Sequence, residues 1–307
     1  MRITEPSYEI LPQGSGIDGI YKQIELCGRT CYASTMRIEE GSAKPFVERM
    51  VNSKHLAMCE HGTVYLTIEY HPDFATNADI VKRYQGNKYS RVNLTEGCAY
   101  VTTNYRVIVE NGWYDDLDFM REPTEWHEKR VTVRFTTQIA VSREANRHRA
   151  NSIAEQSTRY CNYSKDKFDN EISVNLPQFV AALPQGDLSE RTEAGTVDLT
   201  GAALMELARK VATGEASDIE NWLFANAAAE KAYMNLVAAG RKPQEARVVL
   251  PLDTNTELVH TAFVTDWKHF FDLRALGTTG APHPDAKALA QPLYERFVEE
   301  GWIAPGK

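Results

Sequence analysis

The fold is decided by residues 130–160, RVTVRFTTQIAVSREANRHRANSIAEQSTRY, where an apolar segment leads directly into a charged one. Apolar and polar residues alternate from Val131 onward, and this period of two predicts a strand that reaches about Ala140. The charged part that follows carries four arginines and two glutamates. We therefore expect Arg147-His148-Arg149 to be held directly at the end of this strand, where α/β-type sheets commonly place ligand sites.

The rest of the chain is predicted to hold strands early and helices late. Strand-like alternation covers residues 63–70 and 98–109, and helical spacing of apolar residues covers 18–32 and 42–54. Residues 71–97 are polar and irregular, and 258–264 fit either a strand or the start of a helix. Further helices are expected at 201–212, 217–240, 243–251, 266–274 (with Asp266 as N-cap) and from 284 onward.

Together these patterns predict an α+β fold, a mixed sheet flanked by helices with a helix-rich C-terminal half. No linker-like composition interrupts the 307 residues. We therefore expect one domain over residues 1–307, with an inserted excursion at about 71–128.

Composition limits the partners of this chain. Its 34 Lys and Arg stand against 42 Asp and Glu, a net charge of −8, whereas nucleic-acid binding needs a basic face. No apolar run approaches the roughly 18 residues of a membrane span, and no secretory signal is visible. We expect neither a nucleic-acid nor a membrane partner, so an anionic ligand would need a local cluster of positive charge.

The five cysteines are an odd number without any C-x-x-C pair. This usage argues against a disulfide framework and indicates a reducing, cytoplasmic setting. Zinc binding by Cys27, Cys31, Cys59 and His61 is the minor alternative to buried, small apolar side chains. We expect no metal.

Two more segments carry unusual charge. Arg247 stands alone in the apolar segment 246–251, where a buried charge must be paired either by a protein carboxylate or by a ligand phosphate. His269 and Arg274 lie on the predicted helix 266–274. Neither G-x-G-x-x-G nor a Walker sequence is present, so nucleotide binding here would depend on arginines.

These motifs together resemble the signature of flavin-dependent thymidylate synthases over roughly residues 18–276. Arg147-His148-Arg149 is followed after seven residues by Ser157, with Glu155 and Arg159 at matching positions. The family's A-R-x-V-L-P, H-F-x-x-L-R and H-x-x-x-x-E-H elements are matched by residues 246–251, 269–274 and 55–61. The excursion at 71–128 is far longer than in compact members.

The resemblance implies conversion of dUMP to dTMP, with methylenetetrahydrofolate as carbon donor, NADPH as reductant and FAD as carrier. Carried over residue by residue, the side chains that would hold dUMP are Arg147, Ser157, Arg159, Arg247 and Arg274. Arg274 would be the catalytic activator, stabilising an ionised N3 of the pyrimidine. The side chains that would contact FAD are His55, Arg147, His148, Arg149, Glu155 and His269. The resemblance also implies a homotetramer whose active sites are shared between subunits.

Three other interpretations stay open. Glu144 stands where many members have Gln, and Phe263 and Thr265 replace a common Asn and Arg in a flavin-contacting segment. The flavin-segment departures at Phe263 and Thr265 motivate a hydroxymethylase, or an enzyme for another pyrimidine nucleotide, whereas Glu144 bears on the contact with the pyrimidine. A non-catalytic nucleotide- or RNA-binding relative could use the same arginines. Finally, Cys161 could be a nucleophile, although nothing near it in sequence lowers the pKa of its thiol.

Overall fold

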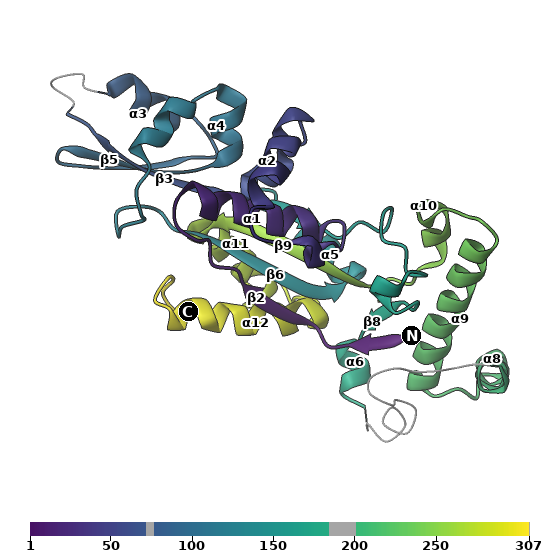
Figure 1. Ribbon diagram of the computed structural model, residues 1–307. Coiled ribbons are helices and arrows are strands. Elements are labelled where there is room, and N and C mark those ends of the chain that lie inside the picture. The colour runs from purple at the N-terminus through teal and green to yellow at the C-terminus, as the bar shows by residue number, and fades with distance from the viewer. Residues whose placement is uncertain (72–76, 184–200, 307) are drawn as a thin grey trace.

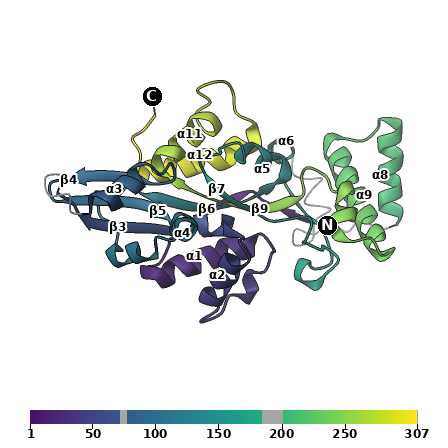
Figure 2. The same cartoon turned by 90° about the horizontal axis from the view of Figure 1, so that it is seen from above.

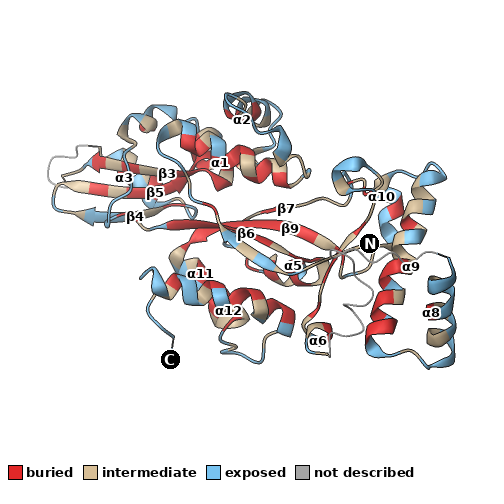
Figure 3. Ribbon diagram, turned by 60° about the horizontal axis from the view of Figure 1, so that its bottom comes forward, coloured by how far each residue is buried: buried red, intermediate tan, exposed pale blue. Residues whose placement is uncertain are grey.

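The computed structural model describes residues 1–71, 77–183 and 201–306. At its centre is a four-stranded sheet in the order β2-β6-β9-β7, antiparallel throughout. Its strands are β2 (Ser7–Ile10), β6 (Arg130–Gln138), β7 (Ser152–Glu155) and β9 (Asn255–Phe263). β6 and β9 are buried along most of their length, as Figure 3 shows.

The two faces of this sheet are covered by different helices (Figure 2). α11 (Val264–Arg274) and α12 (Pro284–Glu299) pack with α5 (Ile139–Ala145) on one face, where Val133, Phe135 and Leu258 belong to their core. α1 (Gly16–Thr30) covers the other face, where Val259 packs beside Cys27. β6 supplies Val131, Val133 and Phe135 to the first of these layers only, whereas β9 supplies Leu258 to that layer and Val259 to the layer under α1.

The excursion is a folded layer of its own. β3 (Thr63–Glu69), β5 (Cys98–Asn104) and β4 (Arg91–Thr95) form an antiparallel sheet in the order β3-β5-β4, flanked by α3 (Ala78–Gln85) and α4 (Tyr105–Asn111). The expectation that 71–97 is irregular was therefore wrong for α3 and β4, whose apolar residues share the core of β3. The strand predicted at 98–109 ends at Asn104, because the Asn104 side chain accepts a hydrogen bond from Val107 N and caps α4.

A third region lies at the opposite end of the molecule (Figure 1). There β1 (Arg2–Thr4) pairs in parallel with β8 (Ser173–Asn175), and α8 (Ala202–Thr213) packs against α9 (Asp218–Ala238). The capping box predicted at the start of α9 is present between Ser217 and Glu220.

The remaining elements are short. The helices are α2 (Ala43–Asn52), α6 (Gln178–Ala181) and α10 (Pro243–Ala246). The 3-10 turns are η1 (Thr35–Arg37), η2 (Leu56–His61), η4 (Tyr114–Phe119), η5 (Asp166–Phe168) and η6 (Arg247–Val249). In the part of the chain that the structure describes, no helix is both long enough and apolar enough to cross a membrane.

The predicted α+β class is confirmed, with parallel pairing in β1–β8 and antiparallel pairing elsewhere. The segment 258–264, which fitted either a strand or the start of a helix, is strand β9 up to Phe263, and Val264 begins α11. Two local expectations need correction. Phe263 rather than Asp266 occupies the N-cap of α11, which places Asp266 inside the first turn. The Arg147-His148-Arg149 motif does not follow β6 directly, because the seven residues of α5 stand between them.

Candidate active site

Arg274, the last residue of α11, is held by the segment that carries the charged motif. Its Nη1 donates to Glu144 Oε2 at 2.6 Å and its Nη2 donates to Glu144 O at 3.1 Å. Its Nε donates to His148 Nε2 at 3.4 Å. The packing of α11 beside α5 therefore joins positions that are about 130 residues apart in the sequence.

His148 is the buried member of this group. Its ring lies against Phe270, with 5.0 Å between centroids, and 5.6 Å from that of His269. Burial and the neighbouring Arg274 cation lower the pKa of His148 to about 4, so the ring is neutral near pH 7. Because Nε2 accepts from Arg274, the proton of the neutral ring belongs on Nδ1, which is buried and has no hydrogen-bond partner among the described residues.

Glu155, at the end of β7, fixes the position of α5. One oxygen accepts from Ser142 Oγ at 2.6 Å and the other from Asn146 Nδ2 at 2.8 Å. These bonds fasten the turn that exposes Arg147 and Arg149 on either side of the buried His148. In the free chain Glu155 thus orients the motif through hydrogen bonds to α5.

A second group of cations lies just beyond β7. Arg247 Nη1 donates to Thr158 Oγ1 at 3.2 Å, beside Ser157 and the exposed Arg159. The apolar segment around Arg247 suggested a buried charge, and this was wrong, because the side chain on η6 is exposed. Arg159 and Arg247 are both exposed and can approach an anion without desolvating a protein partner.

His55 lies apart from Arg274, on the α1 side of the central sheet. It lines a cavity of about 430 Å3 together with Gly28 of α1, Cys31 just after α1, and Phe46 of α2. Ser157 N donates to Cys31 O at 2.9 Å and so connects this cavity to the Arg247 group. One chain therefore arranges the predicted residues in separate groups. The His55 cavity is lined by residues of α1 and α2, whereas Arg274 ends α11 and binds the segment after α5. Figure 2 shows α1 and α2 on one side of the central sheet and α5 and α11 on the other.

Buried histidines form a network that the sequence did not reveal. His61 Nδ1 is 2.8 Å from Thr261 Oγ1, and His260 Nδ1 is 3.1 Å from Asn151 Nδ2. Burial lowers the pKa of each ring to about 3. His61 belongs to the H-x-x-x-x-E-H element, and its inward orientation follows from its place next to β3, a relation that only the fold shows.

Four of the five cysteines are poor nucleophiles at neutral pH, because burial raises the pKa values of their thiols. Cys161 is fully buried, and burial raises the pKa of its thiol to about 11, so the thiolate is scarce at neutral pH. Cys27, Cys31 and Cys59 are free thiols whose pKa values are also raised by burial. Within residues 1–71, 77–183 and 201–306, no group of three or more His, Cys, Asp or Glu is arranged to hold a metal ion.

Comparison with known proteins gave one family match. The model of the thymidylate synthase complementing protein family matches residues 113–301. A search of curated proteins found no match. Two solved structures of the UMP/dUMP methylase PolB from Streptomyces cacaoi are similar, each with 15% sequence identity. For the structure bound with 5-Br dUMP, the alignment covers 99% of the present chain and 100% of the PolB chain, and the TM-score is 0.41. For the one bound with 5-Br UMP, the coverage is 99% of both chains and the TM-score is 0.40.

Proposed function

Because the chain belongs to the thymidylate synthase complementing protein family, we propose that it methylates dUMP to dTMP. Methylenetetrahydrofolate and NADPH serve as co-substrates, and FAD is the cofactor. The observation that carries the proposal is the contact of Arg274 with His148 and Glu144, which joins two motifs of the resemblance in one cluster.

The substrate presents two groups that need directed donors. Its phosphate is a dianion, which suits Arg159, Arg247 and the exposed Arg147, with Ser157 as a further hydrogen-bond partner. Its pyrimidine ring carries an acidic N3–H between two carbonyls. Arg274 is the activator, because a guanidinium fixed by Glu144 and His148 is already oriented when negative charge develops at N3.

The cofactor-binding residues of this chain fit FAD. The exposed guanidinium groups of Arg147 and Arg149 suit its phosphates. His148 has a buried Nδ1 with no hydrogen-bond partner in the described ranges, and a cavity lies beside His55. When bound, FAD supplies the redox chemistry of methylation, so no protein nucleophile is required. We assign Glu155 and His269 to the same cofactor site.

A homotetramer with shared sites accounts for the position of His55. Since the central sheet separates His55 from Arg274 in one chain, a site that uses both takes them from two subunits. Light scattering tests this. A monomer with intact activity would refute the shared site.

A second candidate is an enzyme for another pyrimidine nucleotide, and the carboxylate of Glu144 favours it. In cytosine an amino group replaces the O4 carbonyl of uracil, and a carboxylate accepts a hydrogen bond from that group. The O4 carbonyl of uracil is itself an acceptor, so it repels a carboxylate placed beside it. In the Glu144–Arg274 pair, the carboxylate could accept from the cytosine amino group while the guanidinium donates to N3 and O2 of cytosine.

The deciding experiment measures spectrum and product together. The purified protein is titrated with FAD and dUMP while its absorbance is recorded. It is then incubated with dUMP or dCMP, methylenetetrahydrofolate and NADPH, and the product mass is determined. Methylated dUMP supports the main proposal. Turnover of dCMP alone favours the second candidate, a hydroxymethylated dUMP shows an enzyme that stops before methylation, and a protein that never binds FAD contradicts both candidates.

A further inference from the structure

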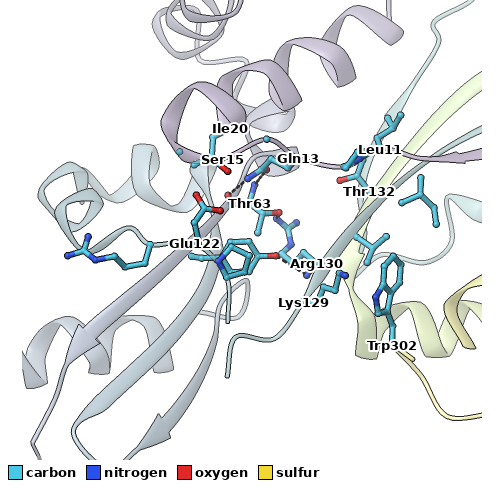
Figure 4. Close-up of a pocket in the computed structure, with 18 of the residues that line it drawn as sticks. Leu11, Gln13, Ser15, Ile20, Thr63, Glu122, Lys129, Arg130, Thr132 and Trp302 are labelled. Atoms are coloured by element: carbon cyan, nitrogen blue, oxygen red, sulfur yellow. Dashed lines mark hydrogen bonds between the residues drawn. The ribbon is translucent and has the colours of Figure 1, made fainter. Parts of the chain in front are cut away.

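A cavity of about 480 Å3 lies at the edge of the central sheet, between the loop before α1, the start of β6 and the C-terminal segment. β2 ends at Ile10, opposite Val133 of β6. Arg130 and Val131 of β6 therefore have no β2 residue beside them, and the cavity lies at this end of β2. Figure 4 shows Lys129 and Arg130 between the loop of Gln13 and Ser15 and the ring of Trp302. None of the described residues assigned above to dUMP or FAD lines this space.

Arg130 is the most unusual side chain in this wall, because it is only 9% exposed. Its Nη1 donates to Glu60 O and to Thr63 Oγ1, and its Nη2 donates to Glu60 O and to Ser152 Oγ, at 3.1–3.4 Å. These acceptors are all neutral oxygens. Its Nε is buried with no hydrogen-bond partner in the described part of the chain.

The positive charge of Arg130 also lacks a free counter-ion. The carboxylates that act on it electrostatically are those of Glu60 and Asp266. Glu60 is already paired with Arg106 at 2.6 Å, and Asp266 lies 3.8 Å from Arg91. Burial accordingly lowers the pKa of Arg130 to about 10. A buried cation of this kind is costly unless an anion approaches it.

Other groups around the cavity favour an anion as well. Lys129 places Nζ 3.8 Å from the ring centroid of Trp302. The exposed Arg121 donates to the carbonyl oxygens of Asp118 and Met120. The side chain of Ser15, at the N-terminus of α1, accepts no hydrogen bond from the first turn of the helix. The backbone N–H groups of that turn thus have no capping side chain at Ser15, and the end of a helix where such groups lie attracts an anion.

The cavity also contains two acidic side chains. Glu300 forms an ion pair with Arg296, so the charges that remain are one carboxylate, Glu122, and three cations, Arg121, Lys129 and Arg130. The wall of the cavity therefore carries a net positive charge, although the whole chain has a net charge of −8. The volume lies within the range of about 300–1,000 Å3 that is usual for small-molecule sites.

We propose that this cavity binds the oxyanion group, phosphate or carboxylate, of a small molecule, at a place separate from the nucleotide site. The anion supplies the counter-charge that Arg130 lacks, while Lys129 and Arg121 hold it from the open side. Trp302 forms the apolar wall for the rest of the ligand.

The test is calorimetric titration of the folded, full-length protein with inorganic phosphate and, in a parallel arm, with succinate. Lys129→Gln removes an exposed charge and so preserves the fold. We expect it to weaken the affinity about tenfold, as loss of one charge-assisted bond does. Stronger binding of phosphate or of succinate tells which oxyanion the cavity prefers. Lys44→Gln, an exposed lysine outside the cavity, is the matched control and should leave the affinity unchanged.

Arg247→Gln separates this site from the dUMP site. Phosphate binding that survives Arg247→Gln and weakens in Lys129→Gln supports the proposal. Binding lost in Arg247→Gln but kept in Lys129→Gln overturns it, as does absence of saturable binding of both anions in the millimolar range. Tryptophan fluorescence gives a second readout. Its change on binding should disappear in Trp302→Phe, and a change that persists there counts against the cavity.

Discussion

Replacing Arg274 by Ala is the sharpest perturbation of the candidate active site. The wild-type guanidinium makes bonds of 2.6 and 3.1 Å to Glu144 and one of 3.4 Å to His148. The side chains of Arg274 and Glu144 are 17% and 30% exposed. The variant removes all three bonds and leaves the Glu144 carboxylate without its cation.

The expected magnitudes follow from this partial burial. Because water can still reach Glu144, the free energy of unfolding should fall by only about 1–2 kcal/mol. This corresponds to a few degrees in Tm for a chain of this length. Catalysis should suffer more, because a preorganised donor at developing charge typically contributes about 2.7–4 kcal/mol to the barrier. We therefore expect dTMP formation to fall about 10²–10³-fold.

The assay is dTMP formation by product mass, with FAD absorbance and thermal unfolding measured on the same preparations. Arg274→Lys keeps the charge but not the planar fork, so it should recover only part of the activity. The control is Arg209→Ala on α8, which breaks exposed pairs with Glu206 and Glu215 and should leave activity unchanged. A folded Arg274→Ala variant that binds FAD and forms dTMP within about threefold of the wild-type rate would show that Arg274 is not the activator.

Arg247→Gln alters an exposed side chain, so it should raise the KM for dUMP about tenfold and change the free energy of unfolding by less than about 0.5 kcal/mol. An unchanged KM for dUMP in steady-state kinetics would show that Arg247 does not bind the substrate phosphate. Glu144→Gln should keep dUMP methylation and lower Tm by about 2 °C, since the amide keeps an acceptor but loses the charge. If dUMP turnover is absent from the wild type and dCMP turnover is lost in Glu144→Gln, the cytosine nucleotide is the substrate. Burial lowers the pKa values of His61, His148 and His260 to about 3, 4 and 3. In the folded chain these rings therefore stay neutral when the pH falls below 6.5, the ordinary pKa of histidine. The unfolded chain then binds protons that the folded chain does not, and the free energy of unfolding should fall from about pH 6.5 toward pH 4 by up to about 1.4 kcal/mol per pH unit for each ring. Urea denaturation across this range checks the effect, and constant stability between about pH 7 and 5 contradicts it.

Sequence patterns predicted the elements best where burial is periodic. β6 places Val131, Val133 and Phe135 on one face, and α9 begins with a capping box, so both elements leave a local signal. β9 is buried along most of its length without alternation, so its segment fitted either a strand or the start of a helix. The excursion was harder, because α3 and β4 are short, mostly polar segments that depend on β3 and β5 for their core. Its folded character therefore became visible only with the strand pairing.

The candidate site divides in the same way. The identities and spacing of Arg147, His148, Ser157, Arg247 and Arg274 lie in the chain itself, and they were enough to suggest a focused anion site in an acidic protein. Their exposure was not readable, because a short apolar segment does not tell whether its arginine points inward. Arg247 was expected to be buried and lies at the surface.

The linear chain thus determines the α+β class, the helices and strands with a clear local period or cap, and the residue types of the motifs, since each depends on neighbours within a few positions. Tertiary structure alone decides that Glu144 binds Arg274, that the sheet separates His55 from both, and that Arg130 is buried beside an open cavity. These relations join residues from tens to more than a hundred positions apart. They arise from the packing of whole elements against one another, which local periodicity does not encode.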